Sequence, residues 1–460
     1  MKVIVCVADT FRRDHMGAYG NPRIHTPNLD RFAAEAALFE QHYIGSFPTV
    51  PNRRDLMLGR GDKGVPFNRW KAIDPDEVTL AERLGEERIP SMMVTDTQNT
   101  VVAGVNLWKG FTAWHCNRGQ EGDGCWLDYT VPLEFPVPPE LIRYTAPWWH
   151  QTLMTRAHRK VEEDWFAPGT YKAALDWLDR NHRLDSFFLY IDTFDPHEPW
   201  DPPDWYERLY DADFAGRRFD APTYGIVKQL GITKREMRNI HARYCGEITM
   251  VDAAFGRLVA GLRKLGIYDE TLLIFTSDHG TCMDLPGDNG MVCKAHILGE
   301  DGRIMAAGMP PLPPLHYYPH YTGIVRIPLV VKLPGQQTPV RVNAITQPWD
   351  LAPTILEAFG LAKPPELWGE SLAPLIRGES KRLRDAAVLG NLHHAQVMTP
   401  QWLYAIWRGQ RPKVLYDLRS DPEQKRDASR RRPEVVKRLH RHLAAYLKRQ
   451  GMEDQLGEYR

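Results

Sequence analysis

This sequence of 460 residues lacks a net charge, a closely spaced cysteine pair and a long apolar run. Lys plus Arg and Asp plus Glu both number 58, so no overall field favours nucleic acid or an anionic membrane surface. The apolar run at residues 2–8 is too short to span a membrane, and it lacks the leader and cleavage site of a signal peptide. We therefore expect a cytoplasmic protein with neither a nucleic-acid nor a membrane partner.

The cysteines are few and scattered, and none forms a C-x-x-C pair. They are Cys6, Cys116, Cys125, Cys245, Cys282 and Cys293. This pattern indicates mostly buried free thiols, as a reducing compartment would allow. A disulfide between Cys116 and Cys125 is the alternative.

Apolar, β-rich runs alternate with helical patterns along most of the chain. The expected strands are residues 2–8, 91–95, 187–193, 271–276 and 327–333. The expected helices between them are residues 28–39, 170–181 and 236–265. Such alternation predicts an α/β fold with a mostly parallel central sheet and helices on both of its faces.

The character of the chain changes near residues 375–385, where a charged linker is followed by short strand-like pieces and a terminal helix. We predict a catalytic domain over residues 1–378 and a small α+β subdomain over residues 379–460. The terminal helix has many Lys and Arg residues, which we interpret as a solvated outer face rather than a nucleic-acid contact.

The longest irregular stretch is the proline-rich segment at residues 309–320. Loops of this length are usually functional or lie at an assembly surface. We interpret the segment as a lid or a contact surface, which leaves a homo-oligomer open.

Polar residues follow three of the expected strands, at Asp9, at Asp195 to His197, and at Asp278-His279. The carboxyl ends of parallel strands share one edge of a sheet, so these side chains should lie together. Adjacent Asp and His can both bind one ion, and their mixed oxygen and nitrogen ligands suit Zn, Mn or Ca. Each residue alone is more often a turn former or a structural histidine.

Thr49 precedes a predicted helix that contains Pro51 and Arg53. At a helix N-terminus the free backbone N–H groups and the macrodipole favour an anion, including a threonine alkoxide. The plain alternative is that Thr49 only caps the helix. Arg53 supplies a guanidinium fork suited to an anion. Lys294 is either a surface lysine or a second cation.

Several of these strings resemble the sulfatase family of the alkaline phosphatase superfamily. They are residues 9–20 with 26–30, residues 49–53, the Pro196-His197 turn, Asp278-His279, and the looser match at residues 287–294, where Asn289 replaces the usual histidine. A sulfatase carries at position 49 a cysteine that is oxidised to formylglycine. Threonine cannot form that aldehyde. Thr10 stands where many sulfatases have a second metal-binding Asp; this departure and His279 both resemble the phosphonate monoester hydrolase branch.

The resemblance implies one divalent ion, with Mn, Zn and Ca all open, and a small anionic ester as substrate. The implied metal ligands are Asp9, Asp278, His279 and Thr49, and the implied catalytic residues are Thr49, Arg53, His197 and Lys294. We expect a hydrolase of phosphodiesters or phosphonate monoesters that forms a covalent Thr49 intermediate. The alternatives are a sulfuric ester hydrolase that uses Thr49 and a catalytically weak binding protein. A second metal set, Asp192 and Asp195 near His197 with His316 or His320, also stays open.

Overall fold

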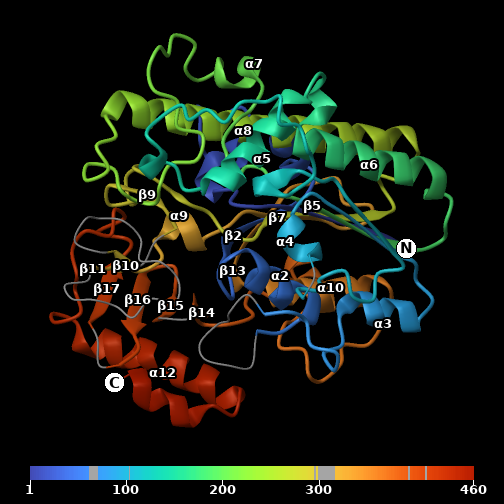
Figure 1. Cartoon of the computed structure of the whole chain (residues 1–460). Coiled ribbons are helices and arrows are strands. Elements are labelled where there is room, and N and C mark those ends of the chain that lie inside the picture. Colours follow the sequence, from blue (N-terminus) through green and yellow to red (C-terminus); the bar gives the residue numbers. More distant parts are fainter. Residues whose placement is uncertain are drawn as a thin grey trace.

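A large, mostly parallel sheet forms the centre of the protein, which we describe from a computed structural model (Figure 1). The structure describes residues 1–61, 71–102, 104–294, 297–298, 316–391, 394–409 and 412–459. The strand order is β13-β2-β12-β7-β1-β5-β3-β4. The bounds are β1 Lys2–Ala8, β2 Ala37–His42, β3 Ser91–Thr95, β4 Ala113–Cys116, β5 Phe187–Thr193, β7 Thr271–Ser277, β12 Leu329–Lys332 and β13 Val340–Thr346. Strand β12 is antiparallel to both of its neighbours, and the other pairs are parallel.

Helices cover both faces of this sheet, as the sequence predicts. Helices α1 (Pro27–Ala33), α6 (Phe166–Asn181) and α8 (Lys234–Lys264) pack on one face, with the even-numbered side chains of β1. Helices α2 (Thr49–Leu58), α3 (Leu80–Glu86) and α10 (Leu351–Ala358) pack on the other, with Val3, Val5 and Val7. The two helix layers lie above and below the strands in Figure 1. Alternate residues of β1 thus enter two separate apolar cores, which explains why the strand is apolar throughout.

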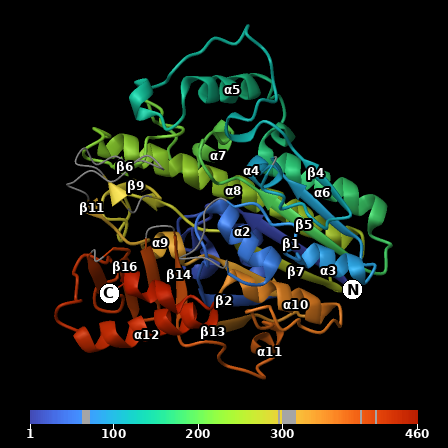
Figure 2. The same ribbon diagram turned by 60° about the horizontal axis from the view of Figure 1, so that its bottom comes forward.

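The C-terminal part forms a second, antiparallel sheet of four strands, β14 Ala387–Asn391, β15 His394–Met398, β16 Trp402–Trp407 and β17 Lys413–Asp417. Helix α12 (Pro433–Arg449) packs on this sheet through Val436, Leu439, Leu443 and Leu447. Figure 2 shows this subdomain beside the main sheet. The fold class is confirmed, while the boundary at residue 378 stays a prediction.

Shorter α-helices and strands lie between these elements. The helices are α4 Gln98–Val101, α5 Ala146–Ala157, α7 Asp204–Glu207, α9 Thr322–Val325 and α11 Ala373–Ile376. The strands are β6 Gly225–Ile226, β8 Cys282–Met283, β9 Met291–Cys293, β10 Ile297–Leu298 and β11 His316–Tyr317. None of the described helices combines the length and the apolar composition that crossing a bilayer requires.

One helix prediction is wrong in its extent. The helix expected over residues 28–39 ends at Ala33, and Ala37–His42 form β2. The Ala-rich stretch favours helix locally, but Ala37 and Leu38 pair with β12, and partners far along the chain outweigh local propensity.

The cysteine prediction is confirmed for the described residues. Cys6, Cys245 and Cys282 are buried free thiols, and Cys116 and Cys125 are partly exposed and unbridged. The side chain of Cys293 and residues 309–315 of the proline-rich segment lie outside the described part of the chain.

Candidate functional site

Two aspartates meet because β1 lies between β5 and β7 in parallel register. Ala8 pairs with Ser277 on one side and with Thr193 on the other. Asp9 directly follows β1 and Asp278 directly follows β7, so both carboxylates lie at the carboxyl ends of adjacent parallel strands. Asp9 is 0% exposed and Asp278 is 1% exposed. The register alone accounts for the pair of buried carboxylates predicted from the sequence.

His279 completes a group that could hold a metal ion. Single ligand atoms of Asp9, Asp278 and His279 all lie within 4.8 Å of one another. The Nδ1 of His279 lies 3.0 Å from the carbonyl oxygen of Gly280, so Nδ1 carries the proton and Nε2 presents a lone pair. Burial, with Lys294 adding to it, lowers the pKa of His279 to about 3. Two carboxylates and a neutral imidazole fit a divalent ion.

Arg53 lies between three buried carboxylates. Its NH1 lies 3.1 Å from Asp9 Oδ2 and 2.5 Å from Asp278 Oδ2. Its Nε and NH2 contact the two oxygens of Asp192 at 2.9 and 2.7 Å. Burial raises the pKa of Asp192 to about 6 although Arg53 opposes that shift. The guanidinium balances charge at the centre of the site.

Thr49 is the first residue of α2, and Pro48 occupies the cap position before it. The Thr49 hydroxyl therefore does not cap the helix. Its Oγ1 lies 3.5 Å from Nε2 of His279, and its side chain is buried. Arg53, one turn later, donates from NH1 to the Thr49 carbonyl oxygen at 3.2 Å. The helix thus brings the hydroxyl and the guanidinium to the same carboxylates.

Thr10 connects Lys294 to the centre. Lys294 Nζ donates to Thr10 Oγ1 at 2.8 Å, and that hydroxyl donates to Asp9 Oδ1 at 2.6 Å. The Thr10 amide donates to Asp278 Oδ1 at 3.0 Å, and its φ of 64° lies in the left-handed region. Lys294 is 7% exposed, and burial lowers the pKa of its ammonium. The lysine is a buried cation of the site and not a surface residue.

His197 lies near Lys294, as does its neighbour in the sequence, Glu198. Its Nδ1 donates to the Glu198 carbonyl oxygen at 2.7 Å, and its ring stacks on Phe194 with centroids 4.0 Å apart. Burial lowers the pKa of His197 well below its usual range, and the charge of Lys294 adds to the shift. At neutral pH the imidazole is uncharged, and its Nε2 carries a lone pair.

Both aspartates of the alternative second metal set are engaged elsewhere. Asp192 binds Arg53, and Asp195 accepts from the Gln120 side chain at 3.2 Å and from the Ala167 amide at 2.9 Å. Among the residues that the structure describes, the groups with metal-ligand spacing are Asp9-Asp278-His279 and one other, which contains none of the residues of that alternative.

The sequence predicted neither the ion pair between Asp192 and Arg53 nor the ion pairs around Glu198, the residue after His197. Glu198, fully buried, pairs with Arg143 and accepts from the Tyr224 hydroxyl, and Arg143 also lies 3.4 Å from Glu121. A carboxylate near the end of a third neighbouring strand was a usable signal for Asp192. No signal in the sequence connects Arg143 to Glu198, because they come from distant loops.

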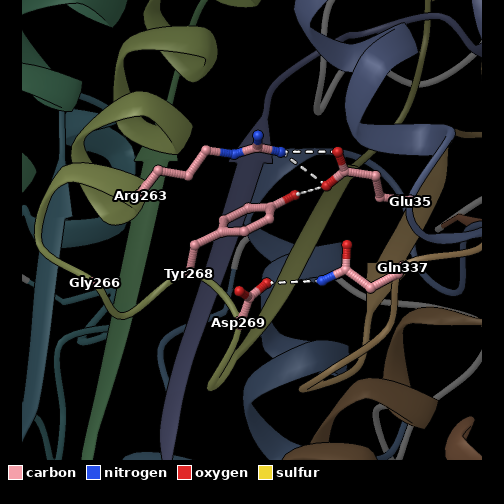
Figure 3. Close-up of a pocket in the computed structure, with 6 residues that line it drawn as sticks. All are labelled: Glu35, Arg263, Gly266, Tyr268, Asp269 and Gln337. Carbon is pink, nitrogen blue, oxygen red and sulfur yellow. Dashed lines mark hydrogen bonds and ion pairs between the residues drawn. The ribbon is translucent and has the colours of Figure 1, made fainter.

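A polar pocket near the amino ends of β7 and β13, at the other end of the strands from the carboxylates, is a poorer candidate (Figure 3). It has a volume of about 290 Å³ and is lined by Glu35, Arg263, Gly266, Tyr268, Asp269 and Gln337. Its polar groups already satisfy one another, because Glu35 binds Arg263 at 2.8 Å and Tyr268 at 2.9 Å, and Asp269 binds Gln337 at 3.0 Å. This arrangement leaves little for a ligand to replace.

The fold belongs to the α/β class, and its carboxylate–histidine centre offers ligands for a divalent metal ion. A model of the sulfatase family matches residues 2–361, and a model of the C-terminal part of N-sulphoglucosamine sulphohydrolase matches residues 319–449. The chain therefore belongs to the sulfatase family, within the alkaline phosphatase superfamily. Members of this family use a divalent metal ion.

Individual relatives carry both sulfur and phosphorus names. An arylsulfatase of Clostridium perfringens is 24% identical over 474 residues, covering 92% of this chain and 89% of the relative. A multifunctional alkaline phosphatase superfamily protein of Trinickia caryophylli is 26% identical over 439 residues, covering 81% and 76%. The phosphonate monoester hydrolase of Agrobacterium radiobacter superposes with a TM-score of 0.71 at 20% identity, covering 98% and 96%. These similarities support an ester hydrolase and leave the ester undecided.

Proposed function

We propose that this protein hydrolyses small monoanionic phosphorus esters, namely phosphodiesters or phosphonate monoesters, with Thr49 as nucleophile. The observation that carries the proposal is the position of the Thr49 hydroxyl, buried at the start of α2 and 3.5 Å from His279 Nε2. A divalent ion held by Asp9, Asp278 and His279 would lower the pKa of that hydroxyl and offset charge on the ester. Thr49 itself is the fourth ligand that we propose.

The covalent chemistry follows from the hydroxyl. The Thr49 hydroxyl loses its proton to water, and its Oγ forms a bond to phosphorus. The bond from phosphorus to the departing oxygen breaks, and that oxygen keeps the electron pair. Water then attacks phosphorus, and the bond from phosphorus to Thr49 Oγ breaks. A sulfated threonine would lack the carbonyl-forming escape that formylglycine offers, which favours phosphorus over sulfur.

The charges of the site favour a substrate with one negative charge. Asp9, Asp192 and Asp278 supply three carboxylates, and Arg53 and Lys294 supply two cations. This set has one negative charge in excess, which a divalent ion converts into one positive charge. While Thr49 keeps its proton, a monoanionic ester brings that balance to zero, so burying it in a dry site carries little electrostatic penalty.

His197 assists the leaving group in this proposal. Its Nδ1 proton is committed to the Glu198 carbonyl oxygen, so Nε2 must gain a proton before it can donate to the departing oxygen. Burial and Lys294 oppose that proton, whereas the negative ester beside the ring favours it. Assistance should therefore matter most for leaving groups that depart poorly as anions.

The test is a rate comparison on metal-loaded protein with a nitrophenyl phosphodiester, a nitrophenyl phosphonate monoester and a nitrophenyl sulfate. Thr49→Ala is the inactive control, and Thr49→Ser is the matched variant that keeps a hydroxyl. We expect both phosphorus esters to react orders of magnitude faster than the sulfate, and only Thr49→Ala to lose that activity. A faster sulfate reaction would overturn the choice of phosphorus, and full activity in Thr49→Ala would overturn the nucleophile.

A further inference from the structure

A second group of metal-ligand side chains lies away from the carboxylate centre. His241 and Cys245 are one turn apart on α8, so they lie on the same face of the helix, and His15 approaches them from the segment after β1. Single ligand atoms of the three residues lie within 4.8 Å of one another. His15 and Cys245 are buried, and His241 is half-buried.

The separations within this trio come close to those around a tetrahedral ion. With Zn–N of about 2.05 Å and Zn–S of about 2.3 Å, tetrahedral ligands lie roughly 3.3 Å apart for two nitrogens and about 3.6 Å apart for nitrogen and sulfur. Cys245 Sγ lies 3.5 Å from His241 Nε2, and His15 Nε2 lies 2.7 Å from His241 Nε2. The sulfur lies at the tetrahedral distance from His241 Nε2, and the two nitrogens need to separate by about 0.6 Å.

Asp14 orients His15 as a ligand. Its Oδ1 lies 2.7 Å from His15 Nδ1, so Nδ1 donates and Nε2 presents a lone pair toward His241 and Cys245. Asp14 is held in turn by Arg12, whose Nε and NH2 donate to its two oxygens at 2.8 and 2.7 Å. A carboxylate behind a ligating histidine is the usual second partner in zinc sites.

The trio also has access to solvent. His241 is only half-buried, and the side chain of Asp14, which contacts His15, is 53% exposed, so the trio lies close to the protein surface. Two imidazoles and a thiolate favour Zn²⁺ or another borderline transition metal over Ca²⁺ or Mg²⁺.

We propose that His15, His241 and Cys245 form a second metal site, of the zinc class, with a water molecule as fourth ligand. This site is distinct from the carboxylate centre and does not depend on the proposed function. It ties the segment that carries Asp9 to α8. Tyr244, between the two helical ligands, already joins these parts, because its hydroxyl donates to the Thr10 carbonyl oxygen at 2.7 Å and accepts from the Arg12 amide at 3.0 Å.

The test uses the full chain, stripped with a chelator and titrated with Co²⁺, whose spectrum reports thiolate ligation. We expect a thiolate-to-cobalt charge-transfer band and the intense visible bands of tetrahedral Co²⁺. Cys245→Ser should abolish the charge-transfer band. The matched control Cys116→Ser, at another unbridged cysteine, should keep it. Asp278→Asn should keep it too, because that carboxylate belongs to the other centre.

Substitutions of His241 and Asp14 test the site through its affinity for Co²⁺. His241→Gln should weaken Co²⁺ binding at the thiolate site at least tenfold, and Asp14→Asn should weaken it about tenfold to a hundredfold. This arm also covers the case in which Cys245→Ser fails to fold. Three results would each contradict the metal site and leave only a hydrogen-bonded histidine pair. They are the lack of a charge-transfer band in the parent protein, a band that persists in Cys245→Ser, and an unchanged Co²⁺ affinity in His241→Gln.

Discussion

Replacing Arg53 by methionine should strongly destabilise the metal-free protein. Arg53 is 1% exposed, and its guanidinium is within hydrogen-bond distance of Asp9, Asp192 and Asp278, all buried. Methionine keeps much of the volume and removes the charge, so three carboxylates lose their shared cation. Removing one partner of a buried ion pair costs about 3–5 kcal/mol. We expect a loss in the free energy of unfolding at the upper end of that range.

The loss should depend on pH with a defined sign. In the parent, burial raises the pKa of Asp192 to about 6, above its unfolded value. Ionising this group therefore costs stability progressively as pH rises from about 4 to 6, by about 3 kcal/mol for the two-unit shift. Without Arg53 the folded-state pKa rises further, so the cost continues to grow above pH 6. The difference between parent and variant should be larger at pH 8 than at pH 5.

Metal should partly rescue this variant. A divalent ion at Asp9 and Asp278 restores positive charge to two of the three carboxylates, and in the parent it must coexist with Arg53 NH1. We expect Arg53→Met to bind Mn²⁺ or Zn²⁺ about tenfold more tightly than the parent, a coupling of about 1.4 kcal/mol.

The assay is urea unfolding at pH 5 and pH 8, with a chelator or with added metal. Arg54→Met is the matched control, because Arg54 is equally buried on the same helix but pairs with Glu77, outside the centre. It should lose stability without metal rescue. If metal-free Arg53→Met unfolds within about 1 kcal/mol of the parent at pH 8, the three carboxylates are not ionised together and the reasoning fails.

Three further outcomes follow from the site. In the phosphonate monoester assay, Thr49→Ser should keep activity within about a hundredfold and Thr49→Ala should lose about 10⁴-fold or more; equal losses in the two variants would contradict a hydroxyl nucleophile. His197→Ala should slow esters with alkyl leaving groups about a hundredfold and nitrophenyl esters less than tenfold, and a uniform loss would remove the leaving-group role. Lys294→Met should lower kcat roughly a hundredfold, measured with saturating ester, whereas a change confined to KM would mean that the lysine binds ground state and transition state alike.

Much of the candidate site could be predicted because it follows from strand register. Asp9 and Asp278 each follow an apolar strand, and parallel neighbours bring the ends of such strands together without further information. Thr49 and Arg53 lie one turn apart on a helix whose start Pro51 indicates. Their roles, the one-metal centre and a cytoplasmic location stay predictions.

The remainder depends on contacts between distant segments. The last three residues of the predicted helix at residues 28–39, Ala37 to Phe39, are strand because β12 and β13 flank them. His15 and His241 are 226 residues apart in the sequence, and only the packing of α8 beside the segment after β1 brings them together. Local propensity and spacing carry no information about such pairs.

Thr10 has a consequence for how this chain relates to its family. A β-branched residue at φ 64° is strained by roughly 1–3 kcal/mol, whereas Asp and Asn adopt that conformation more readily. Aspartate at position 10 would relieve the strain and add a fourth carboxylate beside Lys294, which would cancel the positive excess of a metal-loaded centre. The backbone already has the conformation that either residue needs. A single substitution between Thr and Asp at this position therefore changes the net charge of the metal-loaded site by one unit without a change in backbone conformation.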